Sequence, residues 1–173
     1  MPLPTLPVVA LVIAAVYLLM LVELQLAVFN DRALRARGAV EPADDVYPIL
    51  RIAYPAVFLL IGLEGARHPW LSRDLVLAGL LLFGWAKALK LWVIRTLGSR
   101  WSFRVLVVPG LPLVATGPYR VLRHPNYVAV LGEIVAIAVA LSAPVTGVVS
   151  ALGFAWLLRR RIIVEERALG LRH

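Results

Sequence analysis

The sequence contains no cysteine, which excludes disulfide bonds, thiolate metal sites and a cysteine nucleophile. Its three histidines, His68, His124 and His173, are widely separated, so we predict no metal centre. Charged residues make up only 16% of the chain, whereas 61% of the residues are hydrophobic. A soluble fold of this size cannot hide so much apolar surface, because only part of it is interior. The composition therefore predicts a protein surrounded by membrane lipid.

Acidic residues are also scarce, since 10 Asp and Glu stand against 18 Lys and Arg, which gives a net charge of +8. An excess of this kind can indicate a nucleic-acid partner. In a membrane protein, however, lysine and arginine gather in cytoplasmic loops. We therefore predict no nucleic-acid partner. The length favours one membrane domain that covers residues 1–173.

Three apolar stretches in the first half of the chain are predicted to cross the membrane as helices. They cover Leu6–Phe29, Val46–Leu63 and Leu75–Ile94, and a helical span needs about 20 residues. The first stretch has no basic segment before it and is too long for the apolar part of a signal peptide, so we expect it to remain in the protein. Segment 30–45 is polar, contains glycine and proline, and is predicted to be a loop.

The fourth apolar stretch, Asn126–Leu158, is interrupted by the charge of Glu133 alone. Serine, proline and glycine at 142–147 predict a turn, so the two arms would form a helical hairpin. Residues 159–172 are predicted to leave the bilayer as a C-terminal cytoplasmic helix. The predicted fold class is an all-α integral membrane protein with about five transmembrane helices, of which the last two form the hairpin.

The distribution of arginine predicts the orientation in the membrane. Five spans would place segment 30–45, the connection 95–125 and residues 159–172 on one side, and these hold thirteen arginines. The opposite side would hold two, Arg67 and Arg73. Because lysine and arginine mark cytoplasmic loops, we expect the N-terminus outside and the C-terminus in the cytoplasm.

The connection 95–125 is long for a link between two spans and is rich in arginine and aromatic residues. Long loops with structure of their own are often functional. At its end, His124 and Pro125 precede a helix predicted to begin at Asn126, and the free N–H groups of a helix start favour an anion such as a carboxylate. From these residues alone, a structural turn followed by a helix start remains an equal alternative.

Two separated motifs carry a resemblance to a known family. The run LVATGPYRVLRHPNY (113–127), followed some 35 residues later by RIIVEERAL (161–169), resembles the isoprenylcysteine carboxyl methyltransferase family. Related phospholipid methyltransferases share the Arg-His-Pro and Glu-Glu elements. The resemblance covers roughly 88–170. From this resemblance we predict that residues 95–173 form the cofactor-binding catalytic half. Residues 1–94 would form the three N-terminal spans.

A second Arg-His-Pro tripeptide, Arg67–Pro69, lacks both flanking elements and is predicted to lie on the opposite side from the glutamate pair. A lone tripeptide is weak evidence, so we interpret it as a structural turn. Small bacterial relatives that methylate long-chain polyketide phenols or pyrones on oxygen are also similar to this chain, notably around 101–110.

The resemblance implies S-adenosylmethionine as the methyl donor and a lipophilic acceptor that enters from the bilayer. It also implies that Arg161 faces the acceptor. The residues that it places around the donor are Arg104, Leu111, Pro112, Leu113, Val114, Tyr119, His124, Pro125, Asn126, Tyr127, Glu165 and Glu166.

The residue types suit the chemical groups of that donor. The carboxylate of Glu165 can accept hydrogen bonds from ribose hydroxyls or from the ammonium group. His124 can donate to the donor's carboxylate, and Tyr119 and Tyr127 offer flat surfaces to adenine or to the sulfonium. Arg161 can orient the acceptor oxygen and favour the ionised form of a phenol. From its spacing alone, the glutamate pair is better interpreted as part of a solvated helix face. A donor site therefore requires that the two motifs fold together into one pocket.

Glu133 is an ionisable residue inside an apolar stretch, which makes it a candidate catalytic group. It shares a helix face with Val130 and Asn126, so it could face the cofactor. A salt bridge to Lys87 or Lys90 is an equal alternative.

The sequence thus predicts an S-adenosylmethionine-dependent O-methyltransferase that acts on a carboxylate or phenol of a prenylcysteine-like or polyketide acceptor. One alternative is an NADPH-dependent membrane reductase of the sterol type, although a glutamate pair suits a 2′-phosphate poorly. Another is a small transporter or assembly protein without catalysis. Members of the family often carry a tyrosine-containing tail after the glutamates, whereas this chain has residues 170–173 there. This departure weakens the assignment of a prenylcysteine acceptor, so both the prenylcysteine-like and the polyketide acceptor stay open.

Overall fold

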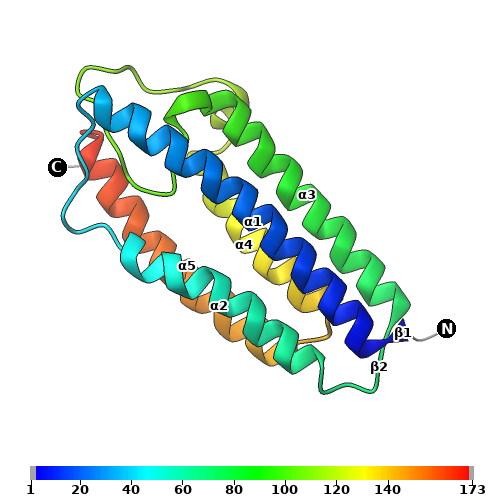
Figure 1. Cartoon of the computed structure of the whole chain (residues 1–173). Helices are drawn as coiled ribbons and strands as arrows, with labels where there is room; N and C mark the ends of the chain where they lie inside the picture. The colour runs from blue at the N-terminus through cyan, green and yellow to red at the C-terminus, as the bar shows by residue number, and fades with distance from the viewer. Residues whose placement is uncertain (1–2, 172–173) are drawn as a thin grey trace.

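The computed structural model describes residues 3–171. In this part of the chain, five α-helices run alternately in opposite directions and lie side by side as an elongated bundle (Figure 1). The helices are α1 (Thr5–Ala36), α2 (Tyr47–Gly65), α3 (Arg73–Leu97), α4 (Pro125–Ala140) and α5 (Pro144–Ala168).

The two ends of the bundle differ. At one end, which we call the strand end, β1 (Leu3–Pro4) pairs antiparallel with β2 (Trp70–Leu71), and a short turn joins α4 to α5 (Figure 1). At the other end, the loop end, lie the two long connections of residues 37–46 and 98–124. The second of these contains the 3₁₀ helices η1 (Gly98–Arg100) and η2 (Gly117–Arg120).

The membrane spans agree in part with the prediction. In residues 3–171, α1, α2 and α3 are long and apolar enough to cross a membrane, whereas α4 is apolar but shorter. The predicted hairpin is present as α4 and α5, because Pro144 starts the second helix after a turn at 141–143. The number of spans beyond these three and the orientation in the membrane stay predictions.

One predicted boundary was wrong. The first helix does not end before Asn30 but continues to Ala36, because the polar residues there are compatible with helix and the chain first turns at Gly38, where φ is 78°. The C-terminal residues predicted to be helical continue α5, which runs unbroken to Ala168 since neither proline nor glycine interrupts it after Leu158. The cytoplasmic location of this part of α5 stays a prediction. Arg172, the predicted end of that helix, lies outside the described residues.

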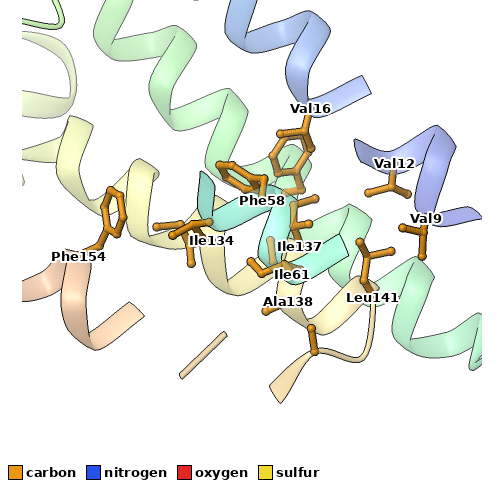
Figure 2. Close-up of a cluster of buried hydrophobic side chains, with 14 of the residues drawn as sticks. Val9, Val12, Val16, Phe58, Ile61, Ile134, Ile137, Ala138, Leu141 and Phe154 are labelled. Atoms are coloured by element: carbon orange, nitrogen blue, oxygen red, sulfur yellow. The ribbon is translucent and has the colours of Figure 1, made fainter. Parts of the chain in front are cut away.

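The hydrophobic core fills the strand half of the bundle. Side chains from α1, α2, α4 and α5 interlock there (Figure 2). Phe58, Ile61, Ile134 and Ile137 are completely buried. Burial of a large apolar side chain contributes about 1.5–3 kcal/mol. This packing holds the helices together at one end, while long connections cover the loop end.

Candidate functional site

A cavity of about 850 Å³ lies in the loop half of the bundle. Its volume falls within the range of roughly 300–1,000 Å³ that is usual for small-molecule sites. Residues of α1, α2 and α3, the connection 98–124, the start of α4 and the second half of α5 form its walls. Every site residue predicted from the sequence lines this cavity except Pro125 and Glu133.

The first motif forms a corner at the start of α4. Pro125 opens the helix, and the backbone carbonyl of His124 accepts hydrogen bonds from the amides of Tyr127 (3.1 Å) and Val128 (3.4 Å). Pro125 thus serves the predicted helix start while its neighbours face the cavity. Upstream, the Gly-Pro-Tyr element forms η2. A Cβ on Gly117 would lie 2.4 Å from Oγ1 of Thr96, so only glycine lets this turn pack against α3.

The second motif meets this corner from the end of α5. The hydroxyl of Tyr127 donates a hydrogen bond of 2.5 Å to Oε2 of Glu165. Nε2 of His124 lies 3.3 Å from Oε1 of Glu166, and its Nδ1 lies 3.6 Å from Oε2 of Glu165. The rings of His124 and Tyr127 stack, with centroids 5.6 Å apart. The two motifs therefore meet in one cluster, as the site requires.

The carboxylates shift the proton affinities of their neighbours. Glu165, and after it Glu166, raises the pKa of His124 above its ordinary value, against the opposing effect of burial. Burial by itself raises the pKa of Glu165, but hydrogen bonds with His124 and Tyr127 outweigh it and lower the pKa below its ordinary value. Burial and the charge of Glu165 raise the pKa of the Tyr119 hydroxyl. The cluster thus favours an ionised carboxylate beside an imidazolium.

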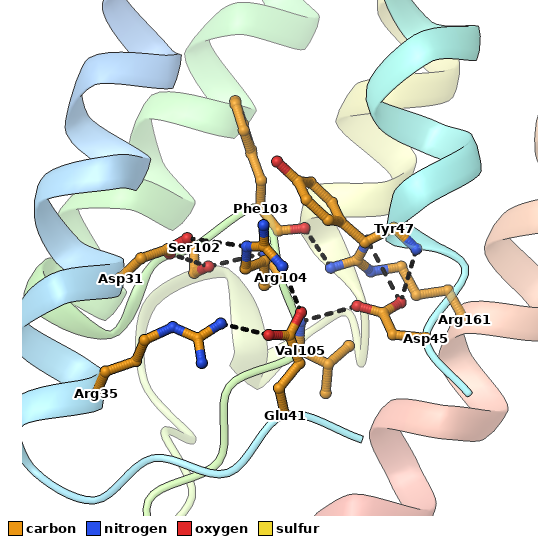
Figure 3. Close-up of polar contacts among 10 residues, drawn as sticks. All are labelled: Asp31, Arg35, Glu41, Asp45, Tyr47, Ser102, Phe103, Arg104, Val105 and Arg161. Atoms are coloured by element: carbon orange, nitrogen blue, oxygen red, sulfur yellow. Dashed lines mark hydrogen bonds and ion pairs between the residues drawn. The ribbon is translucent and has the colours of Figure 1, made fainter. Parts of the chain in front are cut away.

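Arg161 is a buried cation on the cavity wall, with a side chain only 6% exposed. Its Nε donates to the hydroxyl of Tyr127 at 3.1 Å, and its Nη2 donates to the backbone carbonyl of Phe103 at 2.5 Å. Its Nη1 lies 3.7 Å from Oδ1 of Asp45 (Figure 3). We did not predict Asp45 from the sequence, where its charge among the polar residues of segment 30–45 was the sole signal.

Arg104, a predicted cofactor contact, is engaged with the protein itself. Its guanidinium pairs with Glu41 at 2.7 Å and with Asp31 at 3.4 Å, and lies 4.4 Å from the ring centroid of Tyr47 (Figure 3). Burial by itself raises the pKa of Glu41, but Arg104 and Arg35 lower it below its ordinary value. These contacts join the two connections at the loop end, although Arg104 also lines the cavity.

The remaining predicted donor residues surround this cluster. Asn126 accepts a hydrogen bond of 3.4 Å from the indole N–H of Trp101, which is fully buried. The segment 111–114 forms an apolar part of the cavity wall, and the backbone carbonyl of Pro112 accepts a hydrogen bond of 2.7 Å from Arg100. Residues 3–171 hold no group of three or more His, Asp or Glu side chains arranged to bind a metal.

Glu133 forms the salt bridge that the sequence left as an alternative. Its carboxylate lies 2.6 Å from Nζ of Lys90 and 3.0 Å from Nζ of Lys87, and accepts a hydrogen bond of 2.5 Å from Tyr54. Glu23 pairs with the same two lysines at 3.2 and 2.6 Å. We call these five residues the buried ion network. Glu133 itself does not line the cavity, although Glu23, Tyr54 and Lys90 of the network do. Its contacts favour a structural role for Glu133, and its catalytic role stays a prediction.

The family model of the isoprenylcysteine carboxyl methyltransferase family matches residues 77–170. An uncharacterized protein of Bacillus subtilis, YpbQ, is 31% identical over 153 residues, which are 85% of this chain and 88% of the relative. An uncharacterized protein of Haemophilus influenzae is 24% identical over 148 residues, which cover 85% of this chain and 86% of the relative. No solved structure matches the chain. The chain therefore belongs to the isoprenylcysteine carboxyl methyltransferase family, a family of membrane methyltransferases, as its two motifs predicted.

Proposed function

We propose that this protein transfers a methyl group from S-adenosylmethionine to a carboxylate or phenol oxygen of a lipophilic acceptor. One observation carries the proposal: His124, Tyr127, Arg161 and Glu165 converge on the wall of a single cavity of about 850 Å³. A cation, a carboxylate and aromatic rings side by side suit a donor that combines both charges with an adenine ring.

The cavity wall offers a complement to each part of the donor. Glu165 is ionised at neutral pH, since its pKa is lowered, and can accept from the ammonium group or ribose hydroxyls. His124, whose pKa is raised, can donate to the donor's carboxylate beside the start of α4. The apolar segment 111–114 and the ring of Tyr119 offer surface to adenine. The residues present therefore fit this donor.

The rest of the cavity suits an acceptor with an apolar body. Met20, Leu21 and Leu24 of α1 and Leu50 of α2 line it together with the polar cluster. Both helices are candidate membrane spans. A molecule with a hydrocarbon chain and one acidic group could lie along these side chains with its oxygen near Arg161. This arrangement supports the lipophilic class of acceptor.

The transfer needs positioning and exclusion of water rather than a covalent partner. When bound, S-adenosylmethionine supplies the methyl carbon: the acceptor oxygen forms the new C–O bond while the C–S bond breaks and its electron pair stays on sulfur. Arg161 can hold the ionised acceptor oxygen in line with that carbon. The buried walls exclude water, which favours a reaction in which an anion and a cation become neutral products.

The glutamates separate this proposal from the reductase alternative. Glu165 and Glu166 both line the cavity, and carboxylates repel the 2′-phosphate of NADPH. Calorimetric titration of purified protein in nanodiscs with S-adenosylhomocysteine and, separately, NADPH compares the two. We expect micromolar affinity for the first and no binding of the second. Absence of S-adenosylhomocysteine binding at millimolar concentration contradicts the proposal.

A second experiment tests the transfer itself. The protein is incubated with deuteromethyl-labelled S-adenosylmethionine and either N-acetyl-S-farnesylcysteine or a pentadecyl phenol, and the extracts are analysed by mass spectrometry. We expect label on one of the two acceptors, and loss of most of it in Glu165→Gln. The matched control is Glu64→Gln, whose carboxylate accepts the backbone N–H groups of Val145 and Thr146 at the strand end. Binding without transfer to either acceptor leaves a cofactor-binding protein and contradicts the enzymatic part.

A further inference from the structure

Asp45 is a buried carboxylate that lies outside the region matched by the family model, residues 77–170. Its side chain is 3% exposed and sits in the connection 37–46. Its Oδ1 accepts from the backbone N–H of Tyr47 and its Oδ2 from that of Val105, each at 3.2 Å (Figure 3). Two backbone donors from different connections therefore hold this carboxylate in place.

The fixed carboxylate faces Arg161. Nη1 of Arg161 lies 3.7 Å from Oδ1 of Asp45, and the Arg161 side chain is itself 6% exposed. A guanidinium carries five N–H groups. Nε and Nη2 of Arg161 are directed to Tyr127 and to the carbonyl of Phe103, and Nη1 to Asp45. Since each Nη carries two N–H groups, some remain to meet an oxygen in the cavity that Arg161 lines.

The backbone around Asp45 is also tied to the second connection. Val40 and Val107 form a two-hydrogen-bond bridge of 2.8 and 3.0 Å, and Arg104 pairs with Glu41. A side chain held by its neighbours can hold a functional group in a productive geometry, whereas a free one cannot. These contacts fix the connection 37–46 in a position where the side chain of Asp45 faces Arg161 of α5.

We propose that Asp45 is a positioning residue, which fixes the guanidinium of Arg161 in the orientation that receives the acceptor oxygen. The role of Arg161 toward the acceptor rests on the proposed function, but the hold of Asp45 on Arg161 does not. Displacement of a catalytic group by about 1 Å can cost on the order of 100-fold in rate. Asp45 therefore acts on turnover through Arg161 and not through affinity for the donor.

The test compares two neighbouring aspartates. Asp45→Asn removes the charge beside Arg161 with little change of shape. Asp44→Asn is the matched control, because the Asp44 side chain is 56% exposed and pairs with Arg167 at 2.9 Å. In nanodiscs, solvent exchange of the Arg161 Nε–H is followed by nitrogen-15 NMR, with the signal assigned by its loss in Arg161→Lys. We expect this exchange to be about 10-fold faster or more in Asp45→Asn, because the guanidinium has lost the carboxylate that orients it. We expect it to be unchanged in Asp44→Asn.

Turnover is then measured on whichever of the two acceptors the wild type methylates. We expect kcat to fall about 10-fold or more in Asp45→Asn with KM for S-adenosylmethionine unchanged, and little further loss when Asp45→Asn is added to Arg161→Lys. If Asp45 had a structural role only, Asp45→Asn would instead lower kcat by the same factor in the wild type and in Arg161→Lys. If the wild type methylates neither acceptor, the proposed function fails, and the exchange rates alone decide whether Asp45 holds Arg161.

Three results overturn the proposal: wild-type exchange in Asp45→Asn, wild-type kcat in Asp45→Asn where the wild type is active, or equal changes in both aspartate variants. Retained affinity for S-adenosylhomocysteine shows that a variant is folded. Should Asp45→Asn lose that affinity, Asp45→Glu is measured in its place, because it keeps the charge and moves it by one methylene. The proposal then requires faster exchange and lower kcat in Asp45→Glu, and wild-type values there overturn it.

Discussion

The hydroxyl of Tyr127 and the carboxylate of Glu165 lie 38 residues apart in the chain and form a hydrogen bond of 2.5 Å. The same hydroxyl accepts a hydrogen bond from Nε of Arg161 at 3.1 Å. One phenol oxygen therefore links the residue assigned to the acceptor with a residue assigned to the donor. A change at this oxygen should affect both halves of the proposed site.

Replacement of Tyr127 by phenylalanine tests this link. A hydrogen bond to a charged group contributes about 1.5–3 kcal/mol, so we expect affinity for S-adenosylhomocysteine to fall roughly 10- to 100-fold, with a larger loss of kcat. Titration calorimetry measures the affinity. The control is Tyr17→Phe, which removes another cavity hydroxyl, one that donates at 2.8 Å to the carbonyl of Pro55. Equal effects of the two substitutions would contradict a special role for Tyr127.

The pair of His124 and Glu165 predicts a pH-dependent stability. Glu165, and after it Glu166, raises the pKa of His124 above its ordinary value of 6.5. The stabilisation is therefore fully present below pH 6.5 and is lost as the pH rises through the raised pKa. We expect the difference in Tm between the wild type and His124→Gln to shrink as the pH increases above 6.5. Parallel pH profiles of the two proteins would contradict the assigned pairing.

The helices and the meeting of the two motifs could be predicted from the sequence, for different reasons. Hydropathy reports directly on the lipid-facing surface, so the three N-terminal helices and the helical hairpin were found, although the end of α1 was not. The run 113–127 and the pair Glu165 and Glu166 carried a family pattern, and most of the residues that it indicated line one cavity. A contact between His124 and Glu165 needs only that both lie at the same end of adjacent helices.

Asp45 could not be found in the same way. It lies in a connection without hydropathic periodicity, and its contact with Arg161 depends on the path that two connections take across the loop end. The prediction of the end of α1 failed for a related reason. The polar residues before Ala36 indicate exposure to water, but they do not indicate that the helix has ended. The role of Glu133 could not be decided from the sequence, because an ionisable residue in a span suits a cofactor site and a salt bridge equally well.

The buried ion network can decide between these two roles of Glu133. Glu133→Gln leaves Lys90, whose side chain is 3% exposed, short of one partner. Loss of one member of a buried ion pair costs about 3–5 kcal/mol. We expect this loss in the free energy of unfolding, measured in mixed micelles. The combined replacement of Glu133 and Lys90 by leucine should cost less, since Glu23 and Lys87 stay paired at 2.6 Å.

The folded double variant also reports on catalysis. If it binds S-adenosylhomocysteine and methylates the acceptor at the wild-type rate, the role of Glu133 is structural, as its contacts favour. Wild-type binding with abolished transfer would instead support the catalytic role predicted from the sequence. Either outcome separates stability from chemistry, because binding is measured on the same sample.

A close approach of α3 to α4 depends on Gly79. A Cβ at this position would lie 2.4 Å from the backbone nitrogen of Ala140 and 2.6 Å from the carbonyl oxygen of Ala136. Both are backbone atoms, so no side chain can move aside, and overpacking of this kind costs about 1–3 kcal/mol. We expect Gly79→Ala to lower Tm. Gly84→Ala, on the same helix but with nothing within 4 Å of its Cβ, should be neutral or stabilising by up to about 1 kcal/mol, because alanine favours helix.

The two glycine variants together separate packing from helix propensity. If propensity governed both positions, the two substitutions would raise Tm alike, and the close approach of the helices would be wrong. Gly79 lies in the strand half, far along α3 from its end at Leu97 beside the cavity. Below its own Tm, Gly79→Ala should therefore bind S-adenosylhomocysteine with wild-type affinity, because tight packing at one end of the bundle leaves the walls of the cavity at the other end in place.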